Sequence, residues 1–206
     1  MYSIPYYVEP DAEVVLSFMK EYPFAIVTGF GDIFPVASHL PLNIEEVEGK
    51  LIFTGHMMKN TDHHKAFLQN NNVLVIFNGP HCYISASWYP SKAVASTWNY
   101  LTVHAKGKIH FGDEAQTRRM IEMITNTYEC AESKAAFKEL PDEYVNRMIK
   151  AIVGFSIEVE NYEHVYKLSQ NHDTGTRQII ITHLEERGDE NSMAIAQEMS
   201  RQINSL

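Results

Sequence analysis

The only two tryptophans of the chain, Trp88 and Trp98, each stand within two residues of a tyrosine and near hydroxyl side chains. The segments read Ser85-Ala86-Ser87-Trp88-Tyr89 and Thr97-Trp98-Asn99-Tyr100, and the run between them, residues 90–96, has the composition of a loop. Two strand-like arms of this kind can form the wall of a pocket for a flat ligand with polar edges. Packing in a core is the competing interpretation, because Trp and Tyr are common in sheets. Buried hydroxyls and amides need partners, however, and a ligand can supply them.

A second segment that could do chemistry runs from Thr54 to Thr61, where a predicted strand gives way to a predicted helix. Backbone N–H groups at a helix start, helped by Lys59 and His56, are suited to a phosphate monoester. Asn60 or Thr61 can instead serve only as the helix cap, and Asp62 would repel a phosphate. Phosphate binding and structural capping therefore both remain open from these residues alone.

A third segment, Tyr166-Lys167-Leu168-Ser169-Gln170-Asn171, is a cluster of hydrogen-bond donors at a predicted strand exit. A solvated turn is the alternative interpretation of such a cluster. The ten histidines do not follow an HExxH or a Cys/His zinc spacing, so we expect no metal site. The chain also lacks a GxSxG elbow, a P-loop and a GxGxxG motif.

Composition limits the function classes further. The chain has 206 residues, 45% of them hydrophobic, which suffices for one domain with a real core. A formal net charge of −9 disfavours direct binding to nucleic acid or to an anionic membrane surface. Two cysteines, and apolar runs far shorter than the ~20 residues that span a bilayer, predict a cytoplasmic protein without disulfides.

The elements that must position these residues follow from hydrophobic periodicity and turn signals. We expect helices over residues 11–21, 61–70, 113–130 and 141–152, and a mostly helical stretch at the end of the chain. We expect strands over residues 24–30, 34–44, 51–57, 73–77, 82–87, 98–111 and 154–160. This pattern predicts a mainly β fold of the α+β type, a six- to seven-stranded antiparallel barrel with flanking helices.

Five motifs, in order and at similar spacing, resemble the PaiB family of FMN-binding negative transcriptional regulators. They are Gly55-His56-Met57 with Lys59-Asn60, Gly79-Pro80-His81-Cys82-Tyr83-Ile84-Ser85, Ser87-Trp88-Tyr89, Thr97-Trp98-Asn99-Tyr100 with Val103-His104, and Lys167-Leu168-Ser169-Gln170-Asn171. The chain departs from the family pattern at Ser96, where proline is usual, and at His172, where a basic residue is usual.

The resemblance implies an FMN-binding split barrel, a fold shared with pyridoxamine-phosphate oxidases and flavin reductases, in which two subunits build two flavin sites at their interface. It implies a single domain over residues 1–206, with a barrel core of about 24–111 and 153–171 and helical flanks of about 11–21, 113–152 and 174–206. It also implies FMN as the cofactor, held by three sets of residues. His56, Met57, Lys59 and Asn60 would lie near the phosphate and ribityl chain, Ser85, Ser87, Trp98 and Asn99 would approach the flavin, and Lys167, Ser169, Gln170 and Asn171 would close the site.

Three functions are compatible with these features. The first is a regulator that acts indirectly or through a flavin-dependent state, as the resemblance implies. The second is a flavin-dependent oxidoreductase acting on a small molecule, in which His56, Tyr100 or His104 would move protons if they point inward. The third is haem binding, which related split barrels support. The catalytic residues, if there are any, stay unassigned.

Overall fold

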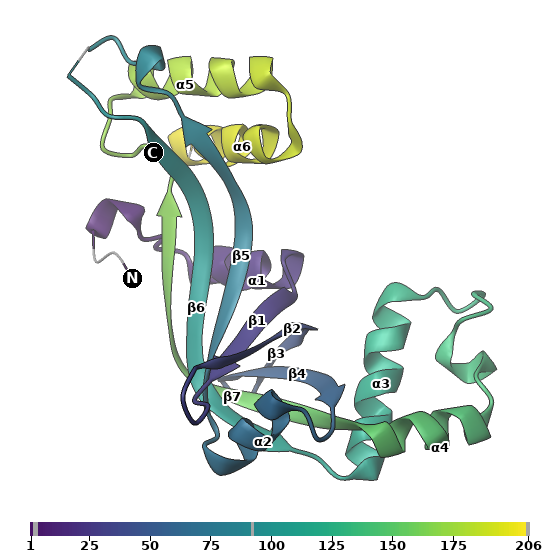
Figure 1. Ribbon diagram of the computed structural model, residues 1–206. Helices are drawn as coiled ribbons and strands as arrows, with labels where there is room; N and C mark the ends of the chain where they lie inside the picture. The colour runs from purple at the N-terminus through teal and green to yellow at the C-terminus, as the bar shows by residue number, and fades with distance from the viewer. Residues whose placement is uncertain (2–3, 92, 205–206) are drawn as a thin grey trace. The chain divides into compact units, whose positions relative to one another are not determined.

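In a computed structural model, which describes residues 1, 4–91 and 93–204, the strands form one seven-stranded sheet in the order β2-β1-β5-β6-β7-β4-β3 (Figure 1). The strands are β1 (Phe24–Gly29), β2 (Val36–Pro41), β3 (Asn43–Val47), β4 (Lys50–Met58), β5 (Asn72–Ile84), β6 (Thr97–Phe111) and β7 (Ile152–Lys167). The α-helices are α1 (Ala12–Glu21), α2 (Asp62–Gln69), α3 (Glu114–Tyr128), α4 (Asp142–Ala151), α5 (Thr174–Arg187) and α6 (Glu190–Asn204). Three short 3-10 helices are η1 (Pro5–Tyr7), η2 (Ala86–Trp88) and η3 (Phe137–Glu139). The predicted fold class, a mainly β antiparallel sheet with flanking helices, is confirmed.

The chain divides into two compact units. Unit 1 comprises residues 1–18, 78–103 and 163–206, and unit 2 comprises residues 19–77 and 104–162. Each contributes part of the long strands β5, β6 and β7, so the boundaries cross these strands without a linker. The predicted single domain stays a prediction, and the two units are described separately below.

Unit 2 contains β1 to β4 and the parts of the long strands next to them. Strand β4 pairs antiparallel with β3 on one side and with β7 on the other, and Phe53 faces both Ile44 and Ile157 in register. The side chain of Phe53 is fully buried and meets the Phe77 ring edge-on at a centroid distance of 5.2 Å. The β3–β4 hairpin turns at Glu48 and Gly49, both with positive φ, as the sequence Glu-Gly-Lys predicts.

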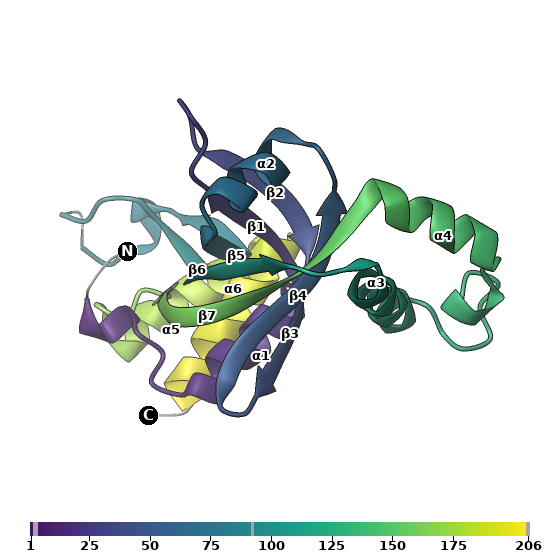
Figure 2. The same ribbon diagram turned by 90° about the horizontal axis from the view of Figure 1, so that it is seen from below.

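Helices α3 and α4, also in unit 2, pack on each other (Figure 2). Val145 and Ile149 of α4 form a small hydrophobic cluster with Phe137 of η3, and Ile121 of α3 packs against it. A capping box starts α3: Asp113 accepts a hydrogen bond from the Gln116 backbone at 2.8 Å, and Gln116 accepts one from the Asp113 backbone at 2.9 Å. Arg118 ties the two helices together through Asp142 and Asn146.

Unit 1 is organised around the helix pair α5 and α6, which lie against each other. Ile180, Ile181, Leu184, Ile195 and Met199 are almost fully buried between them. Asp173 caps α5, and Gly188 ends it in the left-handed conformation that favours glycine. The helical prediction for the end of the chain is therefore confirmed as far as residue 204.

Three strand predictions were wrong in their boundaries. The expected strand over residues 34–44 is divided into β2 and β3, because the chain changes pairing partner from β1 to β4. The expected strands over residues 73–77 and 82–87 are one strand, β5. Gly79 and Pro80, which stand between the two expected strands, lie within β5, and β1 pairs with β5 only from Val73 to Ile76. Proline has no backbone N–H to donate. None is required toward β1 at Pro80, because β1 does not pair with β5 beyond Ile76.

Candidate functional site

The predicted site residues fall into two groups, one in each unit. His56, Met57, Lys59 and Asn60 belong to unit 2, and Ser85, Ser87, Trp98, Asn99, Lys167, Ser169, Gln170 and Asn171 belong to unit 1.

In unit 2, the end of β4 alternates between a core face and a polar face. Met57 is only 2% exposed, so its side chain belongs to the core, and only its backbone is available to a ligand. His56 and Thr54 lie on the opposite face of the strand. The His56 Nδ1 and Thr54 Oγ1 atoms are buried and have no hydrogen-bond partner within the described residues. Burial lowers the pKa of His56, which is therefore neutral at pH 7.

Lys59 follows this strand and contacts the end of α4. Its backbone N–H donates to the Ala151 carbonyl at 2.9 Å, and its Nζ donates to the Ile149 carbonyl at 3.4 Å. The negative end of the α4 helix dipole also stabilises the positive charge of Lys59 in this position.

Asn60 adopts a positive φ of 64° and donates its backbone N–H to His64 Nδ1 at 3.1 Å. The cap of α2 is Thr61, whose hydroxyl accepts from the His64 backbone. This resolves the capping question: Asn60 is the exposed residue before the cap, and its side chain is not used as the cap.

In unit 1, the two tryptophans have different surroundings. Trp88 stacks on His183, with ring centroids 5.1 Å apart and planes at 21°, and the Arg187 guanidinium lies 4.7 Å from its ring centroid. Both contacts come from α5, so Trp88 fastens η2 to that helix. Trp98 is 53% exposed and lies beside His81 and Tyr83 on the neighbouring strand, at centroid distances of 6.2 and 6.1 Å. Trp98 is therefore the tryptophan available to a ligand.

The serines before Trp88 form a local network. Ser85 caps η2, and its hydroxyl lies 2.8 Å from that of Ser87. The Ala86 N–H donates to the Ser96 hydroxyl at 2.9 Å, which joins the two arms of the predicted loop. Serine in place of proline at position 96 thus adds a hydrogen bond. Of that loop, residue 92 lies outside the described residues.

Asn99 and Ser169 form a buried pair. The Asn99 amide donates to the Ser169 hydroxyl at 3.0 Å, and the exposed fractions of the two residues are 0% and 2%. Asn99 therefore orders the polar interior of unit 1, and its side chain does not reach solvent.

The segment Lys167–Asn171 is an ordered turn. Gln170 accepts from the Leu168 N–H at 2.7 Å and donates to the Tyr166 carbonyl, and Ser169 has a positive φ of 61°. Lys167 Nζ donates to the Thr97 hydroxyl, and burial lowers the pKa of Lys167. Asn171 is exposed and its amide lies 3.0 Å from His172 Nε2.

A cavity of about 400 Å³ in unit 1 brings Lys167, Ser169 and Asn171 together. Tyr89 and His172 also line it, and neither was among the predicted site residues. Tyr89 was available as a signal, because it completes the Ser87-Trp88-Tyr89 motif. A second cavity, of about 430 Å³ in unit 2, contains none of the predicted residues.

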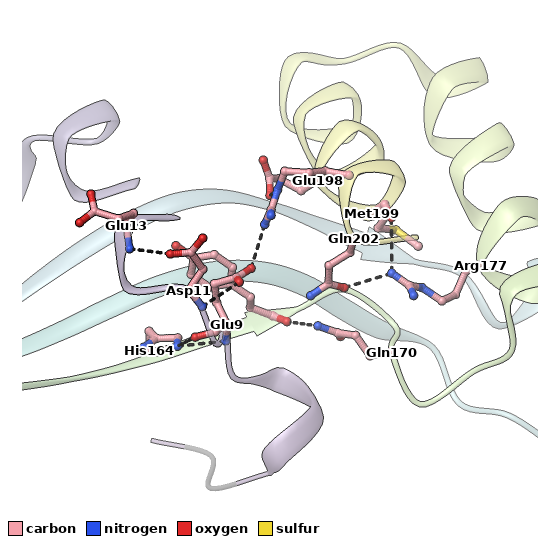
Figure 3. A network of polar contacts seen from close by, with 11 residues as sticks. Glu9, Asp11, Glu13, His164, Gln170, Arg177, Glu198, Met199 and Gln202 are labelled. Carbon is pink, nitrogen blue, oxygen red and sulfur yellow. Dashed lines mark hydrogen bonds and ion pairs between the residues drawn. The ribbon is translucent and has the colours of Figure 1, made fainter. Parts of the chain in front are cut away.

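Arg177 is another residue that the sequence did not indicate. It is 4% exposed and donates to the Gln202 side chain at 3.1 Å and the Met199 carbonyl at 3.4 Å (Figure 3), and no carboxylate pairs with it in the described part of the chain. Burial lowers its pKa. The interior of unit 1 therefore holds a guanidinium bonded only to neutral oxygens.

Two observations on the described residues concern membrane spanning and metal binding. No helix among them is long and apolar enough to cross a bilayer. No three His, Cys, Asp or Glu side chains among them gather in an arrangement that could hold a metal ion.

The sequence model of the family described as "Putative FMN-binding domain" matches residues 1–161. The chain is 31% identical over 204 residues to the Protease synthase and sporulation protein PAI 2 of Bacillus subtilis, with 98% of each chain covered. It is also 26% identical over 238 residues to the uncharacterized protein AN0679 of Emericella nidulans, with 95% of each chain covered.

Among solved structures, the flavocytochrome Anf3 from Azotobacter vinelandii has a TM-score of 0.63 at 16% identity, covering 81% of this chain and 72% of Anf3. The FAD and heme binding protein from Mycobacterium smegmatis has a TM-score of 0.59 at 14% identity, covering 82% and 78% of the respective chains. At these identities the two structures establish the shared fold alone.

The seven-stranded sheet and these matches define a split-barrel protein of the FMN-binding class. The chain belongs to the family of FMN-binding domains that includes the Bacillus subtilis protein PAI 2, and the resemblance to the PaiB family is confirmed.

Proposed function

We propose that this protein binds FMN and acts as a PaiB-type negative regulator of transcription through its flavin-dependent state, without contacting DNA itself. Membership in the FMN-binding family and 31% identity to a protein named for protease synthesis and sporulation support this function. The net charge of −9 opposes direct contact with DNA phosphates. Residence in the cytoplasm is part of the same proposal.

The observation that carries the cofactor proposal is on β4. Strand β4, which leads directly to Lys59, carries two buried polar atoms, Thr54 Oγ1 and His56 Nδ1. Neither has a hydrogen-bond partner among the described residues. Unpaired buried polar atoms are costly, and groups of a bound ligand can satisfy them. In the proposed site Lys59 holds the FMN phosphate, with Asn60 beside it, and neutral His56 donates or accepts a hydrogen bond at the ribityl chain.

We propose flavin contacts for the unit 1 residues as well. Trp98, with more than half of its surface exposed, offers a stacking face to the flavin, and Ser85, Ser87 and the Lys167–Asn171 turn offer polar groups. We further propose that two copies of the chain form a homodimer with the flavin sites at their interface. The exposed rings of Trp98 and Tyr83 suit a surface that a partner or ligand covers.

FMN, when bound, supplies reversible electron or hydride transfer, and the protein residues supply binding and orientation. A flavin-dependent oxidoreductase is the second candidate function. The cavity beside Lys167 favours it, because a reaction requires room for a small molecule.

FMN titration separates these assignments. Lys59→Ala should weaken FMN binding about tenfold, the equivalent of about 1.4 kcal/mol, and should leave riboflavin binding unchanged because riboflavin lacks the phosphate. Trp98→Ala should weaken both ligands. Lys65→Ala, at an exposed lysine of α2, is the matched control and should change neither. Unchanged FMN affinity in both Lys59→Ala and Trp98→Ala would refute the assignment.

The functional part of the proposal has its own tests. The absorption spectrum of the purified protein should show the two visible bands of flavin, whereas a Soret band would indicate haem. Salt-dependent binding of the protein to promoter DNA would contradict the indirect mechanism. A flavin-coupled NAD(P)H oxidation rate would favour the oxidoreductase.

A further inference from the structure

The wall of the cavity in unit 1 includes polar and apolar residues. Lys167, Asn171 and His172 supply polar groups, and residues 93–95, Ala-Val-Ala, supply an apolar part of the wall. Its volume of about 400 Å³ lies within the roughly 300–1,000 Å³ of typical small-molecule sites.

Lys167 provides a positive charge that no acidic group neutralises. Its ammonium group carries three donors, and the hydrogen bond to the Thr97 hydroxyl uses one of them. Within residues 1, 4–91 and 93–204, no carboxylate lies within ion-pair distance of its Nζ. A half-buried cation of this kind is stabilised by an anion that enters the cavity.

Tyr89 and His172, which also line the cavity, are neutral at pH 7. Tyr89 is buried, with its ring centroid 4.7 Å from that of His172, and burial raises the pKa of its phenol. Burial lowers the pKa of His172, although the carboxylate of Asp173 partly opposes this. Asp173 uses one oxygen on the Thr176 N–H and the other on the Thr176 hydroxyl, at 2.9 and 2.8 Å, and so serves the α5 cap.

We propose that this cavity binds the carboxylate of a small organic monoacid, with the carboxylate on Lys167 and the apolar body against the residue 93–95 wall. A single cation balances a single negative charge. A phosphate monoester carries more negative charge than one lysine neutralises. Asn171 and the Tyr89 hydroxyl add neutral hydrogen-bonding groups near the carboxylate.

Lys167 thus binds the carboxylate of a substrate or effector acid, whereas the FMN phosphate is assigned to Lys59. Binding of the acid does not require that FMN binds. If the proposed function holds, the acid occupies the space that a flavin-dependent reaction or a flavin-dependent regulator needs for its small molecule.

Isothermal titration with benzoate, phenylacetate and hexanoate tests the site, with benzamide as the uncharged counterpart of benzoate. At least one acid should bind saturably, and Lys167→Met should weaken it at least about tenfold. Benzamide should bind at least about tenfold more weakly than benzoate. Tyr89→Phe, which keeps the ring, should cause a smaller loss, and Lys65→Met should cause none. Urea unfolding of each variant shows whether it retains its fold.

Three outcomes would overturn the proposal. They are the absence of saturable binding by all three acids, an affinity unchanged in folded Lys167→Met, and equal binding of benzoate and benzamide. Competition distinguishes the source of the anion: if FMN or inorganic phosphate displaces the acid and riboflavin does not, the cavity is a phosphate site and the proposal is wrong. Failure to bind FMN would leave the expected acid result unchanged, so the two proposals fail separately.

Discussion

The Asn99 side-chain amide donates a hydrogen bond of 3.0 Å to the Ser169 hydroxyl, linking β6 to the turn after β7 out of reach of solvent. Asn99 also lies 3.6 Å from the Met199 sulfur of α6. The pair therefore connects a strand, a turn and a helix of unit 1. The hydrogen bond stabilises the cavity wall, because it holds Ser169, which lines the cavity, to the fully buried Asn99.

Ser169→Ala should lower the free energy of unfolding by about 1–3 kcal/mol, because it leaves the buried Asn99 amide without this partner. Alanine and serine bear a Cβ alike, so the positive φ at this position affects both equally. Urea denaturation measures the loss, and Ser87→Ala, at an exposed serine, should change stability by no more than about 0.5 kcal/mol. Equal stability of Ser169→Ala and the wild type would show that the hydrogen bond does not contribute.

The two tryptophans should respond differently to truncation. Trp88→Ala removes the stacking on His183 and the contact with Arg187, and should destabilise the protein by about 1–3 kcal/mol. Trp98→Ala removes a ring that is 53% exposed, and should change stability by about 0.5 kcal/mol or less. Thermal or urea unfolding of both variants gives the comparison, and a larger loss for Trp98→Ala would reverse the roles assigned here.

The fold class was predictable because periodicity and turn signals are local. The Glu48-Gly49 turn, the Asp113 cap and the helical end of the chain each require only neighbouring residues. The continuity of β5 through Gly79 and Pro80 was not predictable in the same way. A Cβ at Gly79 would lie 2.4 Å from the Phe18 ring, so the glycine reflects close packing against a helix distant in sequence.

For the site, the sequence indicated candidate residues by their type, but it did not predict which side chains are buried. The sequence indicated Lys167 and Trp98, and the structure gives each an exposed or cavity-lining side chain. It did not indicate that Asn99 and Met57 are buried, or that Arg177 lacks an acidic partner, because burial depends on tertiary packing. His172 becomes a candidate only when the cavity is seen, whereas Tyr89 already belongs to the Ser87-Trp88-Tyr89 motif.

Stability should fall as the pH decreases below about 6.5, the ordinary pKa of histidine. Burial lowers the pKa of His56 in the folded state, so in this range the unfolded chain takes up a proton that the folded protein does not. Proton uptake by the unfolded state lowers the free energy of unfolding. His56→Gln should therefore show a smaller loss of stability than the wild type between about pH 7.5 and pH 5.5. His110→Gln, at an exposed histidine of β6, should retain the wild-type loss, and an identical pH dependence in His56→Gln would contradict the prediction.

Gly107 lies where β6 passes the backbone of β7 within unit 2. A Cβ at this position would lie 2.3 Å from the Glu158 carbonyl oxygen, which is closer than a carbon atom can approach. It would also lie 3.0 Å from the carbonyl carbon. Because the obstacle is backbone, no side-chain rotation relieves it, and Gly107→Ala should lower the free energy of unfolding by at least about 1–3 kcal/mol. Gly175→Ala, in the first turn of α5, meets only the Asp173 carboxylate at 3.1 Å and should change stability by about 0.5 kcal/mol or less. Urea denaturation of the two variants tests this directly, and a Gly107→Ala protein as stable as Gly175→Ala would mean that β6 and β7 can separate locally at little cost.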